Sequence, residues 1–258
     1  MRLRSPLAAL LVLATILVAP AARAERLIVS VSNDRVTVTS NYDGEELVLF
    51  GAIERDGAPD GRTYDLVVTV SGPPADLVTR RKERKLGIWV NVDSRQFINV
   101  PSYLAVFANR PFDAVATPEL RRNLQIGLDH ILLTQRVGTD YADVVASDPF
   151  RRAFLRLRSD HGLYRENAGA VTFLTPTLFR TSIPLPAQVP IGDYAVDIKL
   201  LSDGVLVGRT VTRFEIVKVG FEQFVATAAR QQPLLYGLVT VMMALITGWF
   251  ASIIFRRD

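Results

Sequence analysis

The sequence contains no cysteine, only two histidines, and no methionine between Met1 and Met242. The lack of cysteine excludes disulfides, thiol nucleophiles, zinc–thiolate sites and covalent haem attachment. The lack of methionine excludes Met-rich copper sites in the region between. Neither histidine belongs to an HExxH pattern, and no GxSxG motif, phosphate-binding glycine loop or EF-hand loop occurs. The sequence therefore predicts no cofactor, no metal and no catalytic residues.

The N-terminal segment has the pattern of a secretory signal peptide. Arg2 and Arg4 precede an apolar run, and Ala22-Arg23-Ala24 has the form of a signal peptidase site. The apolar run is about 13 residues long, shorter than the roughly 17 to 25 residues that a membrane-spanning helix needs. We therefore expect residues 1–24 to be removed.

A long apolar run near the other end predicts a transmembrane helix. Residues 234–255 contain no charged side chain, and Arg256 and Arg257 follow directly. A signal peptide followed by such a helix predicts a single-pass protein of a bacterial inner membrane. The N-terminal domain would then be periplasmic, and residues 256–258 would form a cytoplasmic tail.

The exposed domain is electrically neutral overall. Five of the 30 Lys and Arg residues and one of the 26 acidic residues lie in the signal peptide or the tail, which leaves 25 of each sign. The balance argues against nucleic acid as a partner. Two local basic clusters remain, Arg80, Arg81, Lys82, Arg84 and Lys85 in the first, and Arg151, Arg152, Arg156 and Arg158 in the second. We interpret both as solvated faces, and contact with an anion or a lipid headgroup is the alternative.

Short runs of alternating apolar residues predict a mainly β fold. They recur between residues 27 and 107 and again between 171 and 217, separated by clusters of Gly, Pro, Asn and Asp. Tyr194 follows a proline-rich turn as in a tyrosine corner, and Trp89 stands where a core tryptophan of a middle strand would stand. The pattern favours a periplasmic immunoglobulin-like β-sandwich with Trp89 on an inner strand.

The pattern changes to helical spacing between residues 117 and 167. Thr117-Pro118 can begin a helix, and an apolar stripe runs from Leu120 to Ile131. A second helix is expected from Asp148-Pro149 to Gly162, with its arginines turned towards solvent. We expect a two-helix insertion that packs against the sandwich.

The predicted organisation has seven segments. They are a signal peptide (1–24), the first part of the sandwich (25–116), the helical insertion (117–167), the remainder of the sandwich (168–219), a juxtamembrane helix (220–233), the transmembrane helix (234–255) and the tail (256–258).

A ridge of small side chains runs along the predicted transmembrane helix. It consists of Thr240, Ala244, Gly248 and Ser252, at every fourth position. Small residues at this spacing allow two helices to approach closely in lipid. The ridge predicts either a homodimer or packing against an integral membrane partner.

Four stretches of the sequence resemble the alphaproteobacterial transmembrane protein family Alph_Pro_TM. They are ELVLFGA (46–52), KLGIWVN (85–91), the stretch from Leu185-Pro186 to Tyr194, and PLLYGL (233–238). The resemblance covers nearly the whole mature chain and transfers no catalytic residues. It implies a role beside a multi-pass, sulfite exporter-like transporter.

These observations predict a membrane-anchored interaction module that serves as an accessory subunit of a transporter. A periplasmic sensor of anions or other ligands is the first alternative, and it requires convergent Arg or Lys side chains in a concave site. A membrane-tethered hydrolase is the second, and it requires His130 or His161 beside carboxylates in a pocket.

Overall fold

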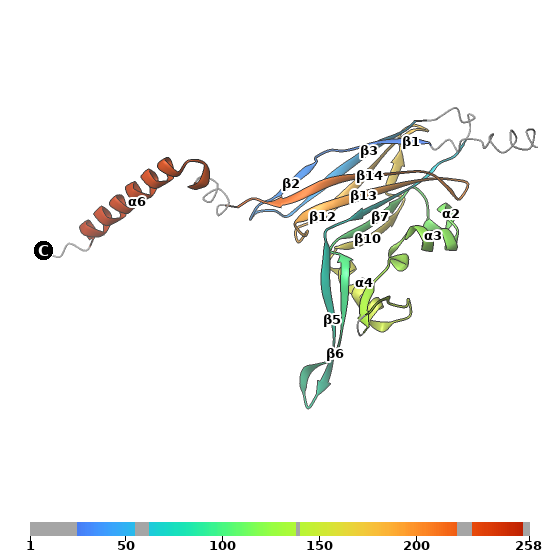
Figure 1. Ribbon diagram of the computed structural model, residues 1–258, viewed down its shortest axis with the longest axis horizontal. Helices are drawn as coiled ribbons and strands as arrows, with labels where there is room; N and C mark the ends of the chain where they lie inside the picture. The colour runs from blue at the N-terminus through green and yellow to red at the C-terminus, as the bar shows by residue number, and fades with distance from the viewer. Residues whose placement is uncertain (1–24, 55–61, 138–139, 221–228, 255–258) are drawn as a thin grey trace, which may run out of the picture.

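The computed structural model describes residues 25–54, 62–137, 140–220 and 229–254, and it is mainly β (Figure 1). The expected signal peptide, most of the expected juxtamembrane helix and the tail lie outside these residues. The described strands form three sheets. The mainly β prediction is therefore confirmed.

The first sheet is antiparallel throughout. Its strands, in spatial order, are β1 (Arg26–Val31), β3 (Gly44–Glu54), β12 (Leu178–Pro186) and β11 (Val171–Phe173). Burial alternates along β3 and β12, so every second side chain faces the core.

The second sheet has six strands and ends in a parallel pair at each edge. Its spatial order is β10 (Tyr164–Ala168), β7 (Leu104–Ala108), β4 (Asp65–Ser71), β13 (Gly192–Ser202), β14 (Val205–Lys218) and β2 (Arg35–Val38). One continuous buried cluster joins it to the first sheet. Leu49 and Ile183 enter this core from the first sheet, and Val68 and Ile198 enter it from the second.

The third sheet is built on a long hairpin that projects from the other two (Figure 1). Its strands are β5 (Pro74–Lys85), β6 (Ile88–Pro101), β8 (Thr134–Val137) and β9 (Asp140–Asp143). The immunoglobulin-like sandwich is therefore not confirmed, because the fold has this third sheet and a parallel strand pair at each edge of the second sheet.

The two features that suggested that sandwich have different outcomes. Tyr194 is fully buried, and its hydroxyl donates to the carbonyl of Pro190 over 2.7 Å, as a tyrosine corner requires. Trp89, in contrast, is 69% exposed near the end of the hairpin. The prediction of an inner-strand tryptophan is wrong, because the outer half of the hairpin extends beyond the layer that would cover it.

The region between β7 and β10 contains short helices, two of which begin where the sequence predicts. Thr117 caps α3 (Pro118–Leu124), and Asp148 caps α4 (Pro149–Asp160). The first predicted helix is too long, because Gln125 adopts a left-handed conformation that ends it. The helices α2 (Phe112–Val115) and η1 (Leu128–His130) and the strands β8 and β9 complete the region.

The C-terminal helix α6 (Pro233–Ile254) is long and apolar enough to cross a membrane. Its described side chains are all exposed, as expected of a helix that meets lipid. Its bounds agree with the transmembrane segment predicted at residues 234–255.

Candidate functional site

The hairpin β5–β6 is closed by a two-residue turn, Leu86-Gly87. Both residues have positive φ angles, 51° and 86°, which suit the right-handed twist of the flanking strands. Across the hairpin, Arg84 lies opposite Trp89 and Lys85 lies opposite Ile88. The turn therefore brings basic and apolar side chains together at the end of the hairpin.

The base of the hairpin is held by aromatic contacts. The rings of Phe97 and Phe154 are 4.7 Å apart, and Phe154 packs edge-on against Tyr164 at 5.7 Å. The Tyr164 hydroxyl donates to the carbonyl of Pro101 over 2.6 Å. These contacts connect β6, α4 and β10, so the hairpin is fixed at one end and projects at the other.

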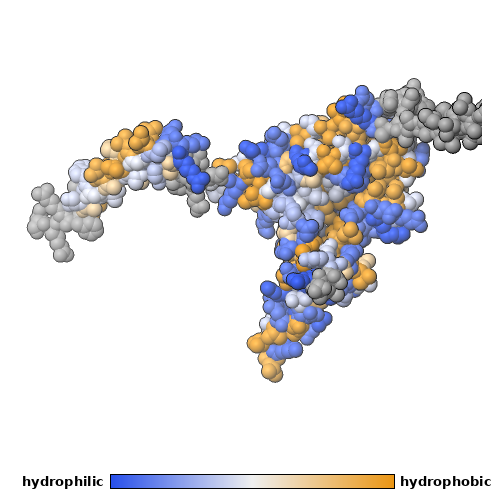
Figure 2. Space-filling view, viewed as in Figure 1, coloured by the Kyte–Doolittle hydropathy of each residue, from blue (hydrophilic) through white to orange (hydrophobic). Residues whose placement is uncertain are grey.

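The free end carries an exposed apolar cluster beyond a more hydrophilic stretch of the hairpin (Figure 2). Leu86 is fully exposed, and Ile88 and Trp89 are 64% and 69% exposed. Between residues 80 and 95 there are six basic and two acidic side chains, a net charge of +4. Exposed clusters of large apolar residues commonly mark interaction surfaces.

A groove of about 460 Å³ lies between the middle of β5 (residues 79–82) and α4. Its rim carries Arg80, Arg81, Lys82, Arg95 and Arg156, and its apolar wall includes Phe150, Ala153 and Leu157. Arg95 is paired with Asp148 over 3.5 Å. The structure thus brings members of both predicted basic clusters into one concave site, whereas Arg84 and Lys85 lie further out on the hairpin.

Two of the four arginines on α4 do not face solvent, which corrects the prediction. Arg151 is 3% exposed, and it donates to the carbonyls of Asp129 and Ile131 over 3.0 and 2.7 Å and to that of Val144 over 3.3 Å. These carbonyls lie beside the first turn of α4. A helical sequence pattern cannot show which carbonyls will lie there, so it could not predict that Arg151 is buried.

Arg158 is the second exception, and it is half-buried. It donates to the carbonyl of Ser102, and its guanidinium lies 5.4 Å from the centre of the Tyr164 ring. Burial lowers the pKa of Arg158 from its usual value. Of the four arginines, only Arg152 and Arg156 are exposed as predicted.

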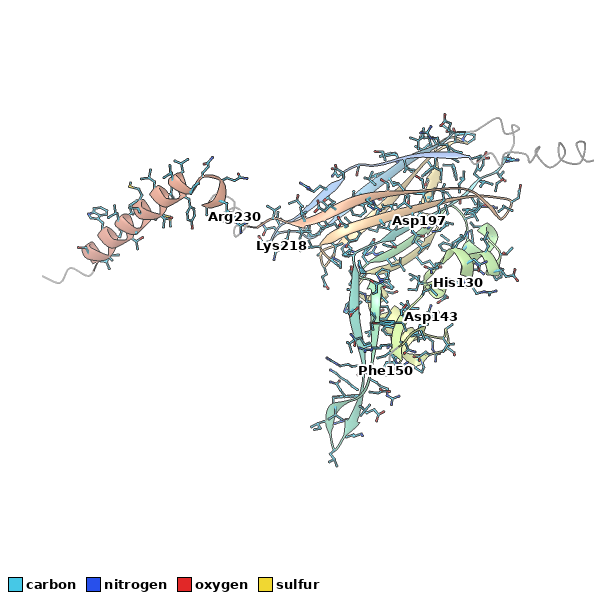
Figure 3. The ribbon with its side chains drawn as sticks, in the orientation of Figure 1. His130, Asp143, Phe150, Asp197, Lys218 and Arg230 are labelled. Atoms are coloured by element: carbon cyan, nitrogen blue, oxygen red, sulfur yellow. The ribbon has the colours of Figure 1, made fainter. Side chains whose placement is uncertain are left out.

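A second cavity, of about 530 Å³, was missed by sequence reasoning. Asp197, Lys199 and Arg209 line its sheet side, on the face of the second sheet turned away from the core, and Figure 3 labels Asp197 there. Lys199 Nζ is 2.6 Å from Asp197, which also accepts two hydrogen bonds from Arg209. The signal in the sequence is the pair of charges at Asp197 and Lys199, which alternate with apolar residues within β13.

The charges in this cavity shift one another's proton affinity. Burial lowers the pKa of Lys199, and the hydrogen bond to Asp197 only partly offsets this effect. Burial alone would raise the pKa of Asp197, but the hydrogen bonds and the positive charges of Arg209 and Lys199 together outweigh it and lower the pKa. Asp197 therefore stays ionised.

The family model described as "Putative transmembrane protein (Alph_Pro_TM)" matches residues 26–257. The chain belongs to the Alph_Pro_TM family. No curated protein matches it.

One solved structure, the sporulation control protein Spo0M from Bacillus subtilis, is similar to this Alph_Pro_TM chain at 13% identity and a TM-score of 0.25. The match covers 75% of this chain and 49% of the Spo0M chain, so it spans about half the length of that protein.

The two histidines of this Alph_Pro_TM chain lie outside both sites. His130 is partly buried at the end of η1 (Figure 3), and His161 is exposed directly after α4. Neither lines the groove or the cavity. Within the described ranges, no group of three or more His, Asp or Glu residues is placed to hold a metal ion. The pocket that the hydrolase alternative requires is therefore not found at either site.

The four small residues predicted to form a ridge all lie on α6, and all four are exposed. Thr240 donates its hydroxyl to the carbonyl of Tyr236 over 2.8 Å, so its polar group is satisfied within the helix. Apart from neighbouring backbone of α6 itself, nothing among the described residues lies within 4 Å of the space that a Cβ on Gly248 would fill. The ridge is accessible to another helix.

Proposed function

We propose that this protein is a single-pass inner-membrane protein whose β-rich domain lies in the periplasm and docks through the β5–β6 hairpin onto an integral membrane partner. The single observation that carries the proposal is the exposed apolar cluster of Leu86, Ile88 and Trp89 on a projecting, firmly based hairpin. The orientation rests on the predicted signal peptide and on the arginines that follow the transmembrane segment.

The chemistry of the hairpin favours a protein partner with an acidic outer surface. Tryptophan and arginine are the residues that most often dominate the binding energy of protein interfaces, and here Arg84 and Trp89 are directly opposite each other. A net charge of +4 along the hairpin would steer it towards an acidic surface.

The transmembrane helix gives the same partner a second contact. Because the ridge around Gly248 is exposed, a helix of the partner can pack against it while the hairpin binds the partner's periplasmic surface. A multi-pass protein satisfies both contacts, and the family resemblance favours a sulfite exporter-like transporter. The proposed role is that of its accessory subunit.

The test places a photo-crosslinking benzoyl-phenylalanine at Trp89 in the full chain in its native membrane. The matched control carries it at Val205, the first residue of β14, which is similarly exposed, at 63%. We expect a protein adduct with a multi-pass partner from position 89 and none from position 205. Adducts with lipid alone at position 89, or equal adducts at both positions, would contradict the proposal.

Anion sensing is the second candidate function, and the convergence of five basic residues at the groove favours it. Asp148 is the one acidic residue of the groove lining, so an anion would relieve repulsion among the cations. The test is the thermal unfolding of the purified full chain in phosphate or sulfate against chloride at equal ionic strength.

We expect the divalent anions to raise the unfolding temperature of the wild type more than chloride does. The difference should be lost in Arg80→Gln/Arg156→Gln and kept in Arg213→Gln, which changes an exposed arginine outside the groove. The same difference in all three proteins would contradict a site at the groove.

A further inference from the structure

We infer that the cavity between the second sheet, β6 and the segment following α3 binds a small, hydroxyl-rich carboxylate of the sugar-acid class. The cavity is formed by parts of the chain that are far apart in sequence: β4, β6, the end of α3, the residues after η1, and the β13–β14 pair. A concave site assembled in this way, with a few convergent polar groups, is the usual setting for a small ligand.

The first argument is that the buried ammonium group of Lys199 lines the cavity and can donate a further hydrogen bond. Lys199 is 3% exposed, and its ammonium has three protons to donate. Its acceptors among the described residues are Asp197 at 2.6 Å and the Thr69 hydroxyl at 3.4 Å. One proton is therefore left for a ligand, and leaving a buried charge incompletely bonded is unfavourable.

The second argument is the charge of the cavity. Lys199 and Arg209 carry two positive charges, and Asp197 neutralises one of them. The remaining charge of +1 is matched by a monoanion. Arg209 uses Nε and Nη2 for Asp197, so its Nη1 can meet a carboxylate that Lys199 also binds.

The third argument is the set of polar, uncharged side chains in the lining. It carries three amide side chains, Asn99, Asn123 and Gln125, and three hydroxyls, Thr69, Ser71 and Thr134. Amides and hydroxyls both donate and accept hydrogen bonds, as do the hydroxyls of a sugar. A ligand with a single carboxylate and several hydroxyls matches both kinds of lining, and the volume is within the range of small-ligand pockets.

Backbone geometry supports the same conclusion. Asn99 and Gln125 both have a φ of 54°, and both line this cavity. Residues other than glycine adopt this region at an energetic cost, and such residues cluster where a ligand is held. They are two of the four non-glycine residues with positive φ among those described; Gln125 also ends α3 in this conformation, whereas Asn99 lies within β6.

The experiment is calorimetric titration of the purified full chain in detergent with three ligands. D-glucuronate carries the carboxylate and the hydroxyls, D-glucose lacks the carboxylate, and cyclohexanecarboxylate lacks the hydroxyls. We expect glucuronate to bind and each of the others to bind about tenfold more weakly or worse, as for loss of one charge-assisted hydrogen bond or several neutral ones.

Two variants locate the binding. Lys199→Met removes the ammonium, and Asn123→Ala changes an exposed residue on the rim that the fold does not depend on. Both should weaken glucuronate binding by about tenfold, whereas Asn167→Ala, an exposed asparagine outside the cavity, should leave it unchanged. Absence of glucuronate binding, equal binding of glucose, or unchanged binding in Asn123→Ala would overturn the inference. The docking of the hairpin is independent of this result.

Discussion

Phe179 lies directly opposite Gly51 in the antiparallel pair of β12 and β3, and its ring fills the space beside the glycine. A Cβ at position 51 would lie 2.2 Å from Cζ of that ring. The ring is fully buried. The cross-strand pair therefore requires glycine on one strand and a large flat side chain on the other.

The first prediction follows from this pair. Gly51→Ala should lower the free energy of unfolding by roughly 1 to 3 kcal/mol, because overpacking forces the ring from its position. Gly220→Ala, where a Cβ would meet nothing within 4 Å, is the control. Adding Phe179→Leu to Gly51→Ala should lose less stability than the two single changes combined, as chemical denaturation can measure. Additive losses would contradict the contact.

The second prediction concerns the buried guanidinium on α4. Arg151→Met should destabilise the protein by about 2 to 4 kcal/mol, because the carbonyls of Asp129, Ile131 and Val144 would lose a charged donor. Arg152→Met makes the same change at the adjacent exposed position and should alter stability by less than about 0.5 kcal/mol. Similar losses in the two variants, measured by denaturant unfolding, would show that Arg151 is not structural.

The third prediction concerns alkaline pH. Burial raises the pKa of Tyr103, Tyr164 and Tyr194 well above the usual value, and each hydroxyl donates to a proline carbonyl. The folded protein therefore holds these protons more tightly than the unfolded chain. Their contribution to stability is complete below about pH 10 and is lost as the pH rises further.

The slope of that loss can be tested directly. Each buried tyrosine contributes up to about 1.4 kcal/mol per pH unit above its unfolded pKa. The free energy of unfolding of Tyr164→Phe should therefore fall less steeply above pH 10 than that of the wild type. Tyr141→Phe, which changes an exposed tyrosine, should keep the wild-type slope. Parallel curves for the wild type and Tyr164→Phe would refute the prediction.

The fourth prediction concerns the transmembrane helix. Gly248→Leu should reduce the yield of the membrane partner in crosslinked affinity purification, because a large side chain would separate the two helices. Met242→Leu, which exchanges two side chains of similar volume on another face of α6, should leave the yield unchanged. Equal recovery from the wild type and Gly248→Leu would count against packing through this ridge.

Features set by neighbouring residues could be predicted from the sequence. Thr117 and Asp148 cap helices because their side chains reach amides two or three positions further along. Tyr194 reaches Pro190, four residues away. The transmembrane segment needs only its own apolar length. The groups that interact in these caps and in the tyrosine corner lie within four residues of each other in sequence, so a local sequence pattern is enough to predict them.

Features set by distant segments could not be predicted. Alternation on β6 predicts a strand, but whether Trp89 is buried depends on what covers the hairpin, and among the described residues none covers Trp89 enough to bury it. The surroundings of Arg151 depend on how the carbonyls of Asp129, Ile131 and Val144 are placed beside α4. The cavity brings Thr69, Asn99 and Lys199 together from three strands, a meeting that only the tertiary fold creates.

The parallel pairing of β2 with β14 has a consequence for biosynthesis. Arg35 and Glu215 form an ion pair across 180 positions of sequence, so β2 cannot pair with β14 until nearly the whole domain has been made. Contacts at such separation form slowly. Because β14 ends at Lys218 and α6 begins at Pro233, the last strand becomes available only shortly before the anchor does. We therefore expect the edge of this sheet to close at about the time that the chain becomes anchored in the bilayer, which makes completion of the domain and its attachment to the membrane nearly simultaneous.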